Sequence, residues 1–228
     1  MSPELLAELA AAAAAWGAPL DRDALARLAS YLEGVRAANT RVNLTADESW
    51  EDLVLKHAAD GVYAAAALRA ELPARGGPAR PRVLDLGAGA GFVGIALKIA
   101  WPEAEVTLME AVERKFRFLS AAAAGVGLPG LRVLRRRAGD GAPLSSYESG
   151  FDAVVERALA PLPEAAGLAF PLLGPRGLLA AFQSAAPDAA QPALAAALAR
   201  ARAVALPARA YRRPREGRDR WLGLYARA

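Results

Sequence analysis

The segment that most constrains the fold of this chain is an apolar run leading into a cluster of glycines. It reads Val83-Leu84-Asp85-Leu86-Gly87-Ala88-Gly89-Ala90-Gly91-Phe92-Val93-Gly94. The apolar run predicts a buried strand, and the apolar stretch after the glycines predicts a helix. Glycines at such a turn let the backbone adopt dihedral angles that a side chain forbids, and let it pass close to a ligand. In open α/β sheets, ligands bind beyond the carboxyl ends of the strands, where this turn would lie.

Predicted strands alternate with predicted helices from Arg82 onward. We expect strands at 83–86, 105–110, 131–135, 151–155 and 177–182, and helices at 92–100 and 112–124. This order predicts an α/β fold with a mostly parallel, Rossmann-like sheet wound by crossover helices. Two later apolar runs, 203–206 and 221–225, have no helix between them, which predicts a closing antiparallel hairpin with an arginine-rich connection.

The first part of the chain reads as helices alone. Leu5 and Leu9 begin a helical spacing that continues to Trp16, Asp21 can cap a second helix, and a third helix is expected from about 49 to 68. The next segment, 73–81, holds three prolines and two glycines and predicts a linker. We therefore expect an N-terminal helical extension over residues 1–72 and an α/β domain over residues 82–228.

The glycine cluster fits two kinds of ligand. Gly89, Gly91 and Gly94 have the spacing of a dinucleotide fingerprint. Asp85 followed by Gly87, Gly89 and Gly91 has the spacing of enzymes that use S-adenosylmethionine. A dinucleotide places its pyrophosphate against the helix N-terminus, where Asp85 would repel it. S-adenosylmethionine carries a sulfonium and an ammonium and no phosphate, so a nearby carboxylate attracts it. The sequence favours S-adenosylmethionine over a dinucleotide.

Composition excludes several kinds of site. The chain has no cysteine, which excludes disulfides, thiolate metal sites and cysteine nucleophiles. No apolar run approaches the length of a membrane span, and the acidic N-terminus does not resemble a signal peptide. We expect a cytoplasmic monomer without a metal or a membrane partner. The net charge of +4 is compatible with a polyanionic partner.

Several separated blocks of the sequence resemble the RsmG (GidB) family of ribosomal RNA methyltransferases, which methylate guanine N7 in the small-subunit RNA. The resemblance runs from about Asn39 to Phe182. It rests on Asn43-Leu44-Thr45, on Lys56-His57 with Asp60, on Asp85 to Gly94, and on Arg157-Ala158-Leu159-Ala160-Pro161-Leu162. It implies that the 82–228 region is a methyltransferase domain that uses S-adenosylmethionine and acts on 16S ribosomal RNA or the small ribosomal subunit.

The resemblance also implies where the site lies. Gly87 and Phe92 would contact the cofactor, Ala138 and Gly139 would lie beside its adenine, and Arg157 would lie in the site. Glu110, which ends the second predicted strand, suits ribose hydroxyls with either ligand. The expected cofactor-binding residues are Asp85, Gly87, Gly89, Gly91, Phe92, Glu110, Ala138, Gly139 and Arg157, and the expected catalytic residues are Arg157 and His57.

The chain departs from the family pattern at three places. The family usually has proline where Val93 stands, serine where Gly61 stands, and a lysine-glycine pair near Gln183-Ser184. The last change lies at the end of the fifth predicted strand, on the functional edge of the sheet. It leaves cofactor binding intact and bears on substrate identity or activity.

The chemistry of the predicted site suits a guanine acceptor. Guanine N7 has a free lone pair at neutral pH, so its methylation requires no general base, whereas pyrimidine C5 normally requires the cysteine that this chain lacks. Enzymes that methylate the adenine amine typically carry an Asn/Asp-Pro-Pro-aromatic tetrad after the fourth strand, where this chain has Glu156-Arg157-Ala158-Leu159. Arg157 can donate to a guanine edge or a phosphate. Alternatively, it pairs with Glu156 or another nearby carboxylate.

Other residues keep two interpretations. His57 is either a partly buried structural residue or a group on the ligand side, oriented by Asp60 one turn away. The arginines between 209 and 220 form either a solvated loop or an RNA contact, and the arginines at 135–137 are better RNA candidates because they end a strand near the cofactor. Two alternatives to an RNA methyltransferase remain, a small-molecule methyltransferase and a non-catalytic relative that binds cofactor or RNA.

Overall fold

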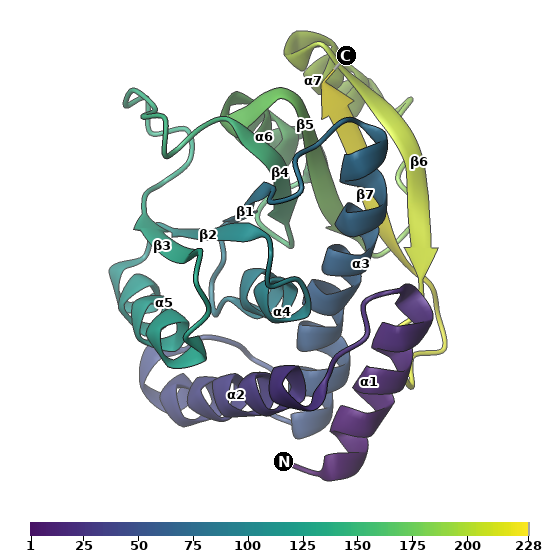
Figure 1. Cartoon of the computed structure of the whole chain (residues 1–228). Coiled ribbons are helices and arrows are strands. Elements are labelled where there is room, and N and C mark those ends of the chain that lie inside the picture. The colour runs from purple at the N-terminus through teal and green to yellow at the C-terminus, as the bar shows by residue number, and fades with distance from the viewer. Residues whose placement is uncertain (228) are drawn as a thin grey trace.

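The computed structural model describes residues 1–227. Its strands are β1 (Arg82–Leu86), β2 (Glu105–Glu110), β3 (Leu131–Arg135), β4 (Phe151–Glu156), β5 (Leu173–Gln183), β6 (Ala203–Tyr211) and β7 (Arg220–Arg227). They form one sheet in the order β3-β2-β1-β4-β5-β7-β6 (Figure 1). β1 to β5 pair in parallel, and β7 pairs antiparallel with both β5 and β6. This topology confirms the predicted Rossmann-like sheet with its antiparallel C-terminal hairpin.

Two strands, β5 and β6, exceed their predicted lengths the most, each by five residues. β5 begins at Leu173 rather than at 177, and the pairing of β4 with β5 contains an irregularity between Phe151 and Ala153. β6 continues past Pro207 to Tyr211 because the register with β7 shifts between Leu206 and Arg209. Such a shift lets an edge strand accommodate a proline, which has no N–H to donate. The connection between β6 and β7 is correspondingly shorter than the sequence indicated.

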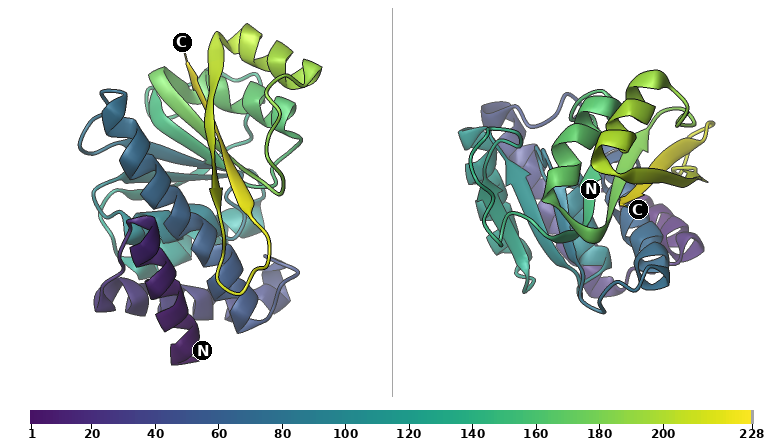
Figure 2. Two further views of the ribbon diagram at one scale, coloured as in Figure 1. Left: turned by 90° about the vertical axis from the view of Figure 1, so that its right-hand side faces the viewer. Right: turned by 90° about the horizontal axis from the view of Figure 1, so that it is seen from above.

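Helices cover both faces of the sheet (Figure 2). They are α1 (Pro3–Trp16), α2 (Arg22–Val42), the π-helix η1 (Asp52–Ala58), α3 (Ala59–Ala74), α4 (Phe92–Ala100), α5 (Glu113–Val126), α6 (Leu162–Ala169), the 3-10 helix η2 (Phe170–Leu172) and α7 (Pro192–Ala201). One apolar core joins side chains of α1 to α5 to one face of the sheet, and a second joins α6 and α7 to the other face. None of the described helices has the length and apolar character needed to cross a membrane.

The N-terminal helices begin as the sequence predicts. The side chain of Asp21 caps α2 by accepting a 2.7 Å hydrogen bond from Ala24 N. The third helical stretch differs from the prediction, since α3 passes through Pro73 and ends at Ala74. The buried side chains of Leu68 and Leu72 continue its packing to that point. Because one core includes both the helices and the sheet, the division into residues 1–72 and 82–228 stays a prediction.

Candidate cofactor and acceptor site

The glycine-rich turn joins β1 to α4 and leaves its ligand side open. Gly87, Gly89 and Gly91 have φ angles of 73°, 60° and 88°, in the left-handed region that favours glycine. The nearest atom to a Cβ added at Gly89 would be the Gly87 carbonyl oxygen, at 3.9 Å. The turn therefore has room for a ligand beside it.

Two carboxylates bind the backbone N–H groups of this turn and of the helix that follows it. Asp85 Oδ2 accepts a 2.8 Å hydrogen bond from Gly94 N, and Glu110 Oε2 accepts one of 2.9 Å from Gly89 N. Glu110 Oε1 also accepts a 2.7 Å hydrogen bond from Val112 N. Both side chains are buried. They fix the turn against the ends of two neighbouring strands.

Burial raises the pKa of Asp85 to about 6. The hydrogen bond from Gly94 and the charge of Arg157 act in the opposite direction, whereas the charge of Glu110 raises the pKa further. The protein's own groups thus stabilise the negative charge of an ionised Asp85 poorly. A cationic ligand would stabilise its charged form.

A cavity of about 320 Å³ opens at the carboxyl ends of β1 and β2. Three of the predicted cofactor residues line it, Gly87, Glu110 and Ala138. Apolar side chains such as Leu159 and the carboxylate of Glu164 line it as well. Apolar walls suit an adenine and carboxylates suit hydroxyls and positive charge, so these residues fit S-adenosylmethionine.

His57, Phe92 and Arg157 form a second, adjacent group. The rings of His57 and Phe92 are stacked, with centroids 4.3 Å apart, and Arg157 Cζ lies 5.7 Å from the Phe92 centroid. His57 Nε2 lies 2.8 Å from Asp47 Oδ2, so Asp47 orients the imidazole. The expectation that Asp60 orients it is wrong, because the Asp60 carboxylate is occupied by other partners.

Burial and the positive charge of Arg157 lower the pKa of His57 to about 4, although Asp47 opposes the shift. The imidazole is therefore neutral at physiological pH. Its Nδ1 atom is buried and has no hydrogen-bond partner within residues 1–227. His57 lies on η1, and π-helical turns occur frequently at functional sites.

Arg157, which follows β4, forms an ion pair with Asp60 and not with Glu156. Its Nη1 atom lies 2.8 Å from Asp60 Oδ2. Glu156 is buried beside it, and burial raises the pKa of that carboxyl to about 7. Of the two interpretations of Arg157, the pairing with a nearby carboxylate is present, and among residues 1–227 most of the guanidinium donors have no other partner.

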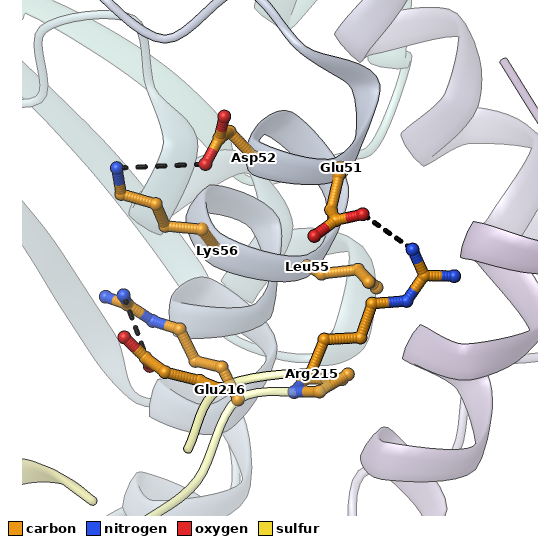
Figure 3. A pocket seen from close by; sticks show the side chains of 8 residues that line it. Glu51, Asp52, Leu55, Lys56, Arg215 and Glu216 are labelled. Atoms are coloured by element: carbon orange, nitrogen blue, oxygen red, sulfur yellow. Dashed lines mark hydrogen bonds and ion pairs between the residues drawn. The ribbon is translucent and has the colours of Figure 1, made fainter. Parts of the chain in front are cut away.

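The arginines between 209 and 220, in β6, in the β6–β7 connection and at the start of β7, are largely paired with acidic residues. Arg215 contacts Glu8 of α1 and Glu51 beside η1, and Figure 3 shows it at a small pocket opposite Asp52 and Lys56. The other pairs are Arg209 with Glu71, Arg212 with Asp219, Arg213 with Asp60, and Arg218 and Arg220 with Glu216. This pairing favours a structural role over an RNA contact.

The arginines at 135–137 do not behave as one group. Arg136 is bound to Asp140 at 3.1 Å and to Glu148 at 2.7 Å, so it stabilises the loop after β3. Arg135 is half exposed and lies 3.2 Å from Glu113. Arg137 lines the cavity and has no ion pair within residues 1–227. Arg137 and Arg135 remain candidates for RNA contact, whereas Arg136 does not.

The structure separates the predicted residues into the cavity and the His57 group, with Asp85 and the turn between them. Gly139 follows Ala138 with a φ of 76°, and a Cβ atom there would lie 2.7 Å from Leu168 of α6.

Sequence reasoning missed Asp47 and the residues of α6 that line the cavity. Asp47 follows the Asn-Leu-Thr block, and that position is the one signal that pointed to it. Residues 1–227 contain no group of three histidine, cysteine, aspartate or glutamate side chains arranged to hold a metal ion.

Comparison with known proteins gives consistent results. A family model described as GidB, rRNA small subunit methyltransferase G, matches residues 24–212. The ribosomal RNA small subunit methyltransferase G of Myxococcus xanthus is 36% identical over 220 residues, which are 96% of each chain. That of Dehalococcoides mccartyi strain BAV1 is 34% identical over 72% of this chain and 66% of its own length. Magnesium protoporphyrin IX methyltransferase from Synechocystis, solved with bound S-adenosylmethionine, has the same fold, with a TM-score of 0.55 at 16% identity over 87% of this chain and 97% of its own.

Proposed function

This chain belongs to the rRNA small subunit methyltransferase G (GidB) family and is an S-adenosylmethionine-dependent methyltransferase, and we propose that it methylates guanine N7 in 16S ribosomal RNA. The family membership confirms the resemblance found in the sequence. A substrate in the small ribosomal subunit would place the enzyme in the cytoplasm, and we expect it to act as a monomer.

The proposed cofactor site consists of the glycine turn and the residues around it. S-adenosylmethionine supplies a methyl group that its sulfonium already activates for in-line transfer to a nucleophile. Asp85 would provide negative charge beneath the turn, Glu110 would face the ribose, and Ala138 with Gly139 would border the adenine. Gly87, Gly89 and Gly91 would let the backbone approach the ligand, and the Phe92 ring would close one side.

Arg157 carries the assignment of the acceptor. It is fixed at the end of β4 with unused N–H donors. Guanine presents O6 beside N7 in a geometry that arginine recognises. Since N7 has a lone pair at neutral pH, the enzyme has to align acceptor and donor rather than remove a proton. The neutral His57, stacked on Phe92, would support that ring beside the acceptor rather than remove a proton.

The test is methyl transfer to small ribosomal subunits from cells that lack this activity, with labelled S-adenosylmethionine. Reduction and aniline cleavage then map N7-methylguanine directly. We expect one labelled guanine, and a parallel reaction on protein-free 16S RNA shows whether the assembled subunit is required. A methyl group on adenine or a pyrimidine would overturn the assignment of the atom. Labelling of a small molecule alone, or cofactor binding without any transfer, would support the two alternative functions.

A further inference from the structure

Asp60 is the most heavily hydrogen-bonded side chain of the site. Its carboxylate is fully buried and accepts four hydrogen bonds from three residues. Oδ1 accepts from the Tyr211 hydroxyl at 2.5 Å and from Arg213 Nε at 2.7 Å. Oδ2 accepts from Arg213 Nη2 at 2.7 Å and from Arg157 Nη1 at 2.8 Å. These bonds fill the acceptor positions of a carboxylate.

Asp60 is shared between two guanidinium groups. Arg213 binds it through two hydrogen bonds, the stronger form of this pair, and also lies 3.7 Å from Glu216, whereas Arg157 binds Asp60 through one hydrogen bond. Burial opposes the ionisation of Asp60, but the hydrogen bond from Arg213 and the charges of both arginines prevail, and its pKa lies below the ordinary value. An ionised Asp60 therefore holds Arg157 by one nitrogen while it is shared with Arg213.

Arg157 has one anchored nitrogen and several available donors. A guanidinium carries five N–H groups. Within residues 1–227, the side chain of Arg157 donates one hydrogen bond, the bond to Asp60. Its side chain is 20% exposed, whereas Asp60 is inaccessible. The anchored end thus points into the protein, and the remaining donors are left for a partner outside it.

We propose that Asp60 is a positioning residue for methyl transfer, which holds the Arg157 guanidinium in place for the acceptor base. This inference rests on the proposed function and extends it to a residue of α3 that does not contact the substrate. Through the same carboxylate, Tyr211 and Arg213 connect the C-terminal hairpin to Arg157. Alignment of the acceptor thereby depends on three elements that are distant in sequence.

The main test is a double-mutant cycle on turnover. We expect Asp60→Asn to lower kcat about 10- to 100-fold, as loss of alignment does, while the Kd for S-adenosylmethionine changes less than about twofold. Arg157→Ala should lower kcat similarly, and the double variant should be no slower than Arg157→Ala alone. Glu71→Gln is the matched control, because it breaks the Glu71–Arg209 pair between α3 and β6 without touching Asp60. An unchanged kcat in Asp60→Asn, or multiplied losses in the double variant, would overturn the proposal.

A second test does not depend on the folding of Asp60→Asn. In Arg157→Ala, Asp60 keeps Tyr211 and Arg213, and added guanidinium ion at millimolar concentration should bind beside it and restore part of the lost turnover. Sodium chloride at equal ionic strength should not. No rescue of Arg157→Ala by guanidinium, or equal rescue by sodium chloride, contradicts the proposal.

A spectroscopic readout separates this proposal from the proposed function. In the wild-type protein, the ¹⁵Nη signals of Arg157 should be resolved because the ion pair restricts rotation, and they should merge in Asp60→Asn. This result is expected whether or not ribosomal RNA proves to be the acceptor. Absence of N7-methylguanine with resolved Arg157 signals would refute the function alone, and merged signals in the wild-type protein would refute the positioning role.

Discussion

His57 lies flat against Phe92, with ring centroids 4.3 Å apart and planes inclined by 10°, at the start of the helix that follows the glycine turn. The stacking buries the imidazole, and burial is the main cause of its low pKa of about 4. A neutral imidazole with one nitrogen bound to Asp47 leaves the other nitrogen as an acceptor. That nitrogen, Nδ1, is itself buried, so the stacked pair is first of all a structural contact beside the glycine turn.

The low pKa of His57 predicts a loss of stability in acid. A histidine whose pKa is lower in the folded state than in the unfolded state contributes stability above the unfolded value of about 6.5, and this stability is lost as the pH falls toward 4. His57→Phe keeps an aromatic ring on Phe92 and removes the titration. Between pH 7 and pH 4, the wild type should therefore lose up to about 3 kcal/mol of unfolding free energy relative to the variant. Urea titrations at several pH values measure it, and parallel curves would contradict it.

Asp85 predicts a pH dependence of cofactor binding. Its pKa of about 6 means that about one tenth of the carboxyl groups are ionised at pH 5. Because the cation of the cofactor favours the ionised form, the affinity for S-adenosylmethionine should rise about tenfold from pH 5 to pH 7. Calorimetry in buffers of different ionisation enthalpy should also detect proton release. Asp85→Asn should bind more weakly with no such pH dependence; an equally steep dependence in this variant would assign it to another group.

A pair of glycine variants tests the ligand side of the turn. Gly89→Leu should abolish binding of S-adenosylmethionine, because the new side chain occupies the open space beside the turn. Gly141→Leu is the control, since Gly141 also has a positive φ, of 77°, and no atom within 4 Å of an added Cβ, but lies in the loop after β3. It should bind the cofactor normally. Unimpaired binding by Gly89→Leu would place the ligand elsewhere.

Two of the departures from the family pattern lie in contact. A Cβ atom added at Gly61 would lie 2.5 Å from the Val93 carbonyl oxygen and 2.7 Å from the Ala96 Cβ. Gly61→Ser should therefore destabilise the protein by about 1–3 kcal/mol, as overpacking of a core does. Gly34→Ser on α2 serves as the control, because a Cβ atom added at Gly34 would have no neighbour within 4 Å. Thermal unfolding compares them, and equal midpoints would show that α3 and α4 can separate without cost.

Arginine variants test the RNA surface. Arg137→Gln should weaken RNA binding and reduce its salt dependence, because it removes one phosphate-directed charge. Arg212→Gln removes an arginine that is already paired with Asp219, and it should leave the RNA affinity and its salt dependence unchanged. Filter binding at several salt concentrations provides the comparison. Equal losses in the two variants would indicate an effect of net charge rather than a contact.

The fold could be predicted because its elements have strong local signals. The strand β2 and the helix α4 were predicted at their observed bounds, since apolar periodicity and flanking turn residues define both. β6 was predicted too short, because Pro207 ends a strand in local reasoning and a register shift is a property of the paired strands. Similarly, the end of α3 depends on buried contacts of Leu72 that no single window of sequence contains.

The site could be predicted only where its residues lie in a continuous motif. The glycine turn and Glu110 follow from strand ends and spacing. The partners of the charged residues do not, because Arg157 and Asp60 are 97 positions apart and Arg213 is a further 56 along. Local reasoning paired Asp60 with His57, one turn away, whereas the structure gives that role to Asp47. Long-range ion pairs depend on the topology of the fold, so the sequence alone does not select which acidic residue pairs with each arginine.

The contacts of α1 also bear on the order in which the chain folds during synthesis. Arg215 is bound to Glu8, 207 positions earlier, and the Trp16 ring contacts Tyr211 edge to face, with centroids 6.2 Å apart. A ribosome therefore translates the first helix long before it completes the hairpin against which that helix packs. Until then α1 has an incomplete apolar face, and contacts of such high sequence separation form late. The first helix of this enzyme therefore completes its packing only after the ribosome has synthesised the segment that contains Tyr211 and Arg215.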